Sequence, residues 1–118
     1  MEDSRLMHSM LLDFYGELLT DKQRECCELH YNEDLSLAEI AEQLGISRQG
    51  VWDNIRRADT SLAEIEEKTG LVARFTEARR SLELLRERVH GLGELCSGEA
   101  RRTAREVEDE LARLKRDI

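Results

Sequence analysis

The sequence predicts an all-α protein in which a helix-turn-helix bundle is followed by a C-terminal, heptad-patterned helical arm or hairpin. Three observations lead to this fold class. The 118 residues include no proline, 37% are charged and only 4% are aromatic, which is typical of helices joined along aliphatic seams. Apolar residues recur at helical spacing on both sides of Gly45, and heptad rhythms follow Gly70.

The central stretch, 37–58, has the spacing of two short helices that meet at a tight turn. Its apolar positions are Leu37, Ile40, Ala41 and Leu44 before the turn and Ile46, Val51 and Ile55 after it. Gly45 lies where the chain must reverse, which favours a residue that tolerates positive φ. Ser47 is placed to cap the second helix. The second helix of such a unit often enters a DNA major groove, so this stretch sets the functional question.

Capping patterns place the other helices of the bundle. A broad apolar stripe predicts a first helix over about 4–19. Thr20 and Ser36 each stand three residues before a Gln or Glu, the pattern of a capping box, and so predict the starts of the second and third helices. The fourth helix begins after Ser47, continues along a heptad-like seam and stops at Gly70.

Beyond Gly70, two further apolar rhythms predict two more helices, over about 71–90 and 99–117. We expect a bend between them that carries Gly91 and Gly93, each of which weakens a helix by about 1 kcal/mol relative to Ala. The last helix either folds back on the preceding one or continues it as a broken rod.

The sequence accordingly predicts two domains, a helix-turn-helix domain over 1–70 and a dimerisation or partner-binding arm over 71–118. A lone hairpin would leave the apolar rows of the arm exposed, and a second copy of the chain would cover them. We therefore expect a homodimer whose seam contains seven apolar residues of the arm. These are Phe75, Leu82, Leu85, Val89, Val107, Leu111 and Leu114.

The net charge of −8 is concentrated in the first part of the chain. Residues 1–46 carry 3 Lys and Arg against 11 Asp and Glu, whereas residues 71–118 carry 11 against 10. Acidic surface repels phosphate, so we expect no strong non-specific binding to DNA. A local basic face on one helix can still bind nucleic acid.

Several function classes lack their sequence patterns here. The cysteines have no C-x-x-C spacing and the histidines no i, i+4 partner, which argues against a metal site. Because no nucleophilic constellation or glycine-rich phosphate loop occurs, we expect no enzyme and no cofactor. Of the adjacent Cys26 and Cys27, we expect one to be buried and one partly exposed. The free thiols and the lack of a long apolar run predict a cytoplasmic protein that does not enter a membrane.

The exposed face of the fourth helix contains the candidate binding residues. They are Ser47, Arg48, Gln49, Trp52, Arg56 and Arg57. Arg and Gln near the start of a recognition helix can bind base edges, and the later arginines can reach phosphates. The alternative is the solvated side of an ordinary amphipathic helix. Trp52 could be an interface hot spot, a platform for unpaired bases, or a side chain packed against the C-terminal helices.

Three segments, 14–23, 29–41 and 46–57, resemble the YlxM family of small bacterial helix-turn-helix proteins, with matches over about residues 10–68. The likeness to region 4 of sigma factors is broader. The YlxM resemblance implies an all-helical protein tied to the signal recognition particle pathway, a link that rests on genes beside those of the targeting machinery. That family usually has Ala and Tyr where this chain has Gly50 and Trp52, and Gly50 loosens the first turn of the recognition helix.

Three functions follow from these features. The resemblance and the net charge favour an adaptor or regulator that binds the protein or the RNA of the signal recognition particle. The helix-turn-helix itself allows a sequence-specific DNA-binding transcriptional regulator. The heptad seams alone would make the chain a purely structural dimer or a module for a partner helix.

Overall fold

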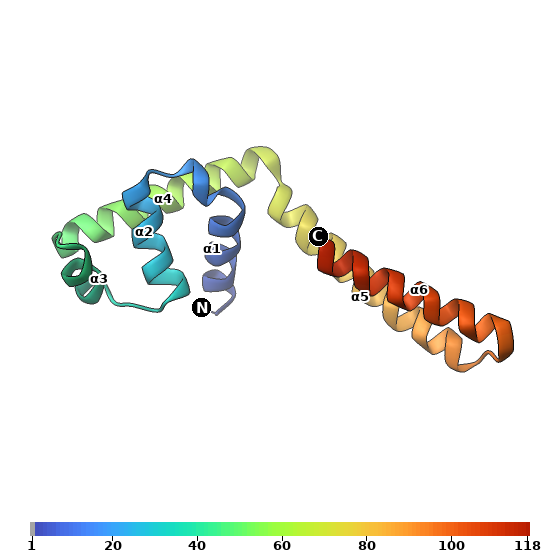
Figure 1. Ribbon diagram of the computed structural model, residues 1–118. Helices are drawn as coiled ribbons and strands as arrows, with labels where there is room; N and C mark the ends of the chain where they lie inside the picture. Colours follow the sequence, from blue (N-terminus) through green and yellow to red (C-terminus); the bar gives the residue numbers. More distant parts are fainter. Residues whose placement is uncertain (1) are drawn as a thin grey trace. The chain divides into compact units, whose positions relative to one another are not determined.

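A computed structural model describes residues 2–118, with side chains from Ser4 onward. The elements are α1 (Glu2–Tyr15), a 3-10 turn (Gly16–Leu18), α2 (Asp21–Cys27), a π-helical turn (Glu28–Asn32), α3 (Leu37–Leu44), α4 (Arg48–Thr69), α5 (Leu71–Glu94) and α6 (Gly98–Asp117) (Figure 1). No strand occurs within this described range, which confirms the all-α class. The chain divides into two compact units, the first ending at Val72 and the second comprising Ala73–Ile118.

In the first unit, the long α4 packs against α1, α2 and α3 (Figure 1). Its buried stripe consists of Val51, Ile55, Ala58 and Leu62, at the three- and four-residue steps of one helix face. The core around this stripe is aliphatic apart from Tyr15 and the two adjacent cysteines. One side of α4 is therefore held by the core and the other side remains available.

Two complete capping boxes begin α2 and α3, as the sequence predicts. Thr20 Oγ1 accepts a hydrogen bond from the Gln23 amide at 3.2 Å, and Ser36 Oγ accepts one from the Glu39 amide at 3.1 Å. The prediction for the end of the first helix was too long, because α1 stops at Tyr15. The N-cap at Thr20 needs extended backbone, so the chain leaves the helix through the 3-10 turn before it.

Cys26 and Cys27 are both fully buried, so the expectation that one would be partly exposed was wrong. Adjacent residues on a helix point about 100° apart and need cover on two sides. The helical segment 21–32 receives that cover because α1, α3 and α4 all pack against it.

The end of α4 is fixed by a carboxylate that serves several donors. Gly70 ends the helix in the left-handed region at φ 63°, where the sequence places the stop. The Tyr15 hydroxyl donates to Glu66 Oε1 at 2.6 Å, and the Val72 amide donates to the same oxygen at 3.0 Å. Glu66 thus ties α1 to the last turn of α4 and to the first residues after it.

In the second unit, α6 folds back along α5 as an antiparallel hairpin, so the hairpin alternative is the one that forms (Figure 1). The predicted position of the bend was wrong, because α5 continues through Gly91 and Gly93 to Glu94. A Cβ atom on Gly93 would lie 3.1 Å from Ala104 Cβ. This glycine therefore allows the two helices to approach closely instead of breaking one of them.

Candidate functional site

The turn between α3 and α4 fixes the start of the recognition helix. Gly45 ends α3 in the left-handed region at φ 69°, and the Ile46 amide donates to the Ala41 carbonyl at 3.1 Å. Ser47 Oγ then accepts from the Gly50 amide at 2.9 Å. The hydroxyl of Ser47 is therefore engaged within the turn, where it caps α4.

Because the core holds one side of α4, five of the predicted site residues point outward. Arg48, Gln49, Trp52, Arg56 and Arg57 are all exposed. At about 100° per residue, the first four share one flank of the helix and Arg57 lies on the other flank. The structure thus brings the predicted site residues to one surface of the first unit, in the order that the helix dictates.

Trp52 is the most unusual side chain of this surface. It is 43% exposed, and the Arg56 guanidinium lies over its ring at 5.1 Å from the ring centroid. Such a cation–π contact restrains both side chains, and both remain exposed to solvent. A large aromatic ring and a charge are therefore presented together to solvent.

Open grooves run along both flanks of α4. One, of about 390 Å³, lies between Trp52, Tyr31 and Leu37. The other, of about 530 Å³, has Arg56 and Arg57 in its wall together with Gln23. Tyr31, Leu37 and Gln23 come from other helices, and no periodicity in the sequence associates them with α4, so sequence reasoning missed them.

The arginines of this surface lack acidic partners. Among the residues that the structure describes, Arg48, Arg56 and Arg57 form no ion pair, whereas Arg5 reaches Asp34 at 2.7 Å and Arg24 reaches Asp21 at 3.6 Å. Unpaired guanidinium groups are available to phosphate or carboxylate groups of another molecule.

One acidic group, Asp53, limits in two ways how this surface meets phosphate. Gln49 Nε2 donates to Asp53 Oδ1 at 3.2 Å, which occupies an amide that would otherwise bind a base edge. Asp53 also lines the groove that contains Arg56 and Arg57. A partner must therefore either avoid this carboxylate or donate a hydrogen bond to it.

A polar cluster supports the wall of the groove beside Trp52. The Tyr31 hydroxyl donates to Asp59 Oδ2 at 2.7 Å, and the ring of His8 stacks on Tyr31 with centroids 4.6 Å apart. Burial, the hydrogen bond to Asp59 and the negative charge of the Asp59 carboxylate all raise the pKa of Tyr31. The phenol therefore stays protonated and remains a donor at physiological pH.

The predicted dimer seam of the arm divides into two rows. Its half-buried members are Phe75, Leu82, Val89 and Leu111. The other three, Leu85, Val107 and Leu114, are 47%, 41% and 42% exposed. The hairpin alone thus covers part of the predicted seam and leaves the rest at its surface.

Two kinds of feature are absent from the described part of the chain. Between residues 2 and 118, no three His, Cys, Asp or Glu side chains converge as they would around a metal ion. None of the helices described there has an apolar stretch long enough to cross a membrane.

Comparison with known proteins identifies the family. The family model described as "Putative helix-turn-helix protein, YlxM / p13 like" (UPF0122) matches residues 2–96. A UPF0122 protein of Thermoanaerobacter sp. (strain X514) is 50% identical over 95 residues, which cover 75% of this chain and 81% of that relative. A UPF0122 protein of Caldanaerobacter subterraneus subsp. tengcongensis is 53% identical over 87 residues, or 74% of each chain. The chain therefore belongs to the UPF0122 (YlxM / p13-like) family of helix-turn-helix proteins.

Proposed function

We propose that this protein is a regulatory adaptor of the bacterial signal recognition particle pathway, and that it acts in the cytoplasm by binding the particle's RNA or protein through the exposed face of α4. Membership of the UPF0122 family and the resemblance to YlxM support the pathway. Three cysteines without a disulfide support a reducing compartment.

One observation carries the binding site of this proposal. Three unpaired arginines and a 43% exposed Trp52 share the outer side of a helix whose inner side is fixed by the core. Guanidinium groups bind phosphates, and an indole stacks on unpaired bases or fills an apolar pocket of a protein. The acidic surroundings and the Gln49–Asp53 hydrogen bond make duplex DNA a poorer partner.

The test is a set of fluorescence anisotropy titrations at physiological salt. Labelled particle RNA, labelled particle protein, the reconstituted particle and a random DNA duplex are each titrated with the full chain. We expect binding to a particle component that is at least about tenfold tighter than binding to the duplex. No binding to the particle or to either isolated component would refute the proposal.

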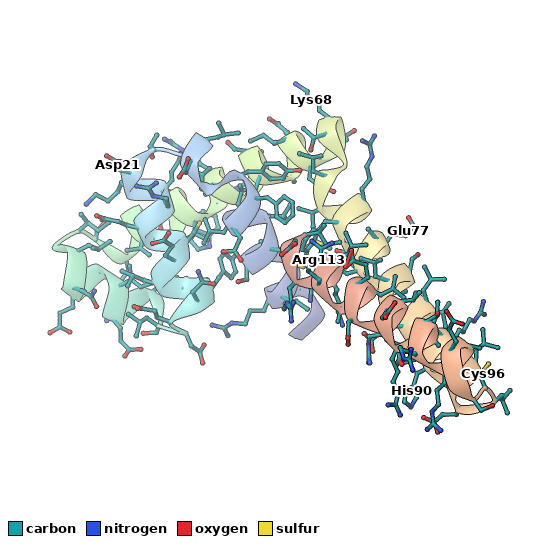
Figure 2. The ribbon with its side chains drawn as sticks, turned by 45° about the vertical axis from the view of Figure 1, so that its right-hand side comes forward. Asp21, Lys68, Glu77, His90, Cys96 and Arg113 are labelled. Carbon is teal, nitrogen blue, oxygen red and sulfur yellow. The ribbon has the colours of Figure 1, made fainter. Side chains whose placement is uncertain are left out.

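Variants of α4 locate the contact. Trp52→Ala and the double change Arg56→Gln/Arg57→Gln should each weaken binding by about tenfold or more, because each removes stacking or charge-assisted contacts. Lys68→Gln is the matched control, since it removes one positive charge from the last turn of the same helix (Figure 2). If Lys68→Gln weakens binding as much as Trp52→Ala or Arg56→Gln/Arg57→Gln does, the contact reflects overall charge and the assigned face is wrong.

A specific observation keeps a DNA-binding transcriptional regulator as the second candidate. Arg48 and Gln49 are exposed in the first turn of the second helix of a helix-turn-helix, where base edges are read. On this alternative, Arg48→Ala/Gln49→Ala relaxes sequence preference. Arg56→Gln/Arg57→Gln weakens binding to every sequence and lowers the salt slope by about one per arginine. Absence of duplex binding at low salt would refute it.

A further inference from the structure

One edge of the α5–α6 hairpin is closed by polar contacts between the helices. They are the Glu83–Lys115 ion pair at 2.9 Å, a hydrogen bond between His90 Nδ1 and Glu108 Oε1 at 2.8 Å, and the Glu94–Arg101 ion pair at 3.6 Å. The Arg86 and Lys115 hydrogen bonds lower the pKa of Glu83 to about 2, so this carboxylate is charged at neutral pH. The first two contacts also set the register, with residue 83 level with 115 and residue 90 level with 108.

The opposite edge is apolar and open. On α5, Leu85 and Leu92 are one heptad apart and are 47% and 59% exposed. On α6, Val107 and Leu114 are also one heptad apart and are 41% and 42% exposed. Residues seven apart share a helix face, so each helix presents one row of large apolar side chains.

Helix geometry puts both rows on the same side of the hairpin, away from the ion pairs. On α5, Leu85 follows Glu83 by two residues and therefore points about 200° away from it. On α6, Leu114 precedes Lys115 by one residue and points about 100° away from it. Because the helices are antiparallel, these rotations bring the two rows to one edge. The hairpin is thus charged along one edge and apolar along the other.

We propose that this apolar edge is the interface between two copies of the chain, whose hairpins associate as a four-helix bundle with both loops at the same end. The register places Leu85 within one residue of the level of Leu114, and Leu92 within one residue of the level of Val107. When α5 of one copy lies against α6 of the other, these layers stack at matching heights across a two-fold axis. Half of a helical bundle exposes such layers, and a second copy supplies the missing half.

The charges beside the apolar rows favour this arrangement over others. The row on α5 is flanked by Arg74 and Arg88. The row on α6 is flanked by Glu110 and Asp117, which both pair with Arg113 of the same helix. Arg88 and Glu110 are level in the hairpin, so packing α5 against α6 of the second copy brings opposite charges together. Packing α5 against α5 would instead place Arg88 beside Arg88 of the second copy, and these like charges repel.

The interface uses a helix that lies beyond the region matched by the family model. That match ends at residue 96, in the loop before α6. The complete apolar edge requires Val107 and Leu114 from α6. Dimerisation through the hairpin is therefore independent of the proposed adaptor function of α4, and either can fail without the other.

Adjacent leucines provide a matched test of the interface. Leu84 and Leu85 are each 47% exposed, but Leu84 points about 100° away from Leu85, toward the outer side of α5. The full-length wild type, Leu84→Lys and Leu85→Lys are compared by sedimentation equilibrium and light scattering over about 1–100 µM. Circular dichroism checks that the helical content is unchanged.

We expect the wild type and Leu84→Lys to be dimers. Leu85→Lys should raise the dimer Kd by at least about a hundredfold, because a two-fold interface buries the substituted charge twice. A wild type that is monomeric over the whole concentration range overturns the proposal. Equal dissociation of the two lysine variants overturns it as well.

Two further measurements test the arrangement. Arg88→Glu and Glu110→Arg should each raise the dimer Kd by about threefold to tenfold, and the double variant should restore much of the loss. Cys96 lies at the loop end of the hairpin and is partly exposed, whereas the other two cysteines are buried, so a spin label attaches there selectively (Figure 2). Loops at one end give a short distance between labels. Loops at opposite ends give about 30 Å or more and overturn this arrangement.

Discussion

The Tyr31 hydroxyl donates a hydrogen bond of 2.7 Å to Asp59 Oδ2, and this bond joins the π-helical turn to α4. The other carboxylate oxygen, Asp59 Oδ1, is buried without a hydrogen-bond partner among the described residues. The bond therefore supports one wall of the groove beside Trp52, and no hydrogen bond to the other carboxylate oxygen reinforces it.

Tyr31→Phe should lower the free energy of unfolding by about 1–3 kcal/mol, because it removes a donor from a partly buried carboxylate. Urea denaturation followed by circular dichroism measures the change. A loss below about 0.5 kcal/mol would show that water replaces the hydroxyl and that the bond contributes little. The same variant should also change the affinity of the α4 surface for its partner, although it removes only one hydroxyl group, because Tyr31 lines the groove.

The stability of the first unit should fall as the pH rises above 9. Burial raises the pKa of Cys27 from its ordinary value of 9.0 to about 12, and burial also raises the pKa of Cys26. Between about pH 9 and pH 12 the unfolded chain releases the Cys27 proton that the folded chain retains, so alkali favours unfolding. For Cys27 the loss approaches about 1.4 kcal/mol per pH unit.

Cys27→Ala tests this explanation. The substitution leaves a small void, so the variant is less stable than the wild type at pH 8. Its free energy of unfolding should nevertheless fall less steeply between pH 9 and 10.5, because the variant releases up to one proton fewer on unfolding. The difference in slope is up to about 1.4 kcal/mol per pH unit. Identical slopes for the two proteins, in urea titrations at fixed pH, would assign the alkaline sensitivity to other groups such as Tyr31.

Local rules predicted the local structure well. The capping boxes at Thr20 and Ser36, the left-handed glycines at Gly45 and Gly70 and the cap at Ser47 all depend on residues within four positions of one another. Two of the predictions that failed depend on contacts between distant segments. Gly93 is read as a helix breaker until Ala104 is placed against it. One of the two adjacent cysteines is expected to be partly exposed until other helices pack against the segment 21–32 and bury both.

The candidate site was predictable to the same extent. Helical periodicity placed Arg48, Trp52 and Arg56 on the open side of α4. It could not supply Tyr31 or Leu37, because these reach the groove only through the packing of other helices on α4. Pairing of charges is equally non-local, so the lack of acidic partners for the arginines became visible only in the folded chain.

Ser36→Ala should lower the free energy of unfolding by about 1 kcal/mol, because the hydroxyl caps the Glu39 amide at 3.1 Å. Ser97→Ala is the matched control, since Ser97 is the N-cap residue of α6 but makes no side-chain cap bond. We expect no measurable change from that control. The Ser36 amide and hydroxyl also lower the pKa of Glu39 below 4.5, so the capping contribution should decline as the pH falls through that range.

Two glycines of α5 should respond in opposite ways to the same substitution. Nothing lies within 4 Å of a Cβ atom at Gly91, so Gly91→Ala should raise the free energy of unfolding by about 0.5–1 kcal/mol through helix propensity alone. At Gly93 the added methyl group would meet Ala104 Cβ at 3.1 Å, and that atom is fixed to the backbone of α6. Gly93→Ala should therefore gain nothing or lose stability, since the hairpin must open slightly to accept it. Equal stabilisation by both substitutions, measured by urea denaturation of the full chain, would show that the helices do not approach as closely at Gly93 as this structure describes.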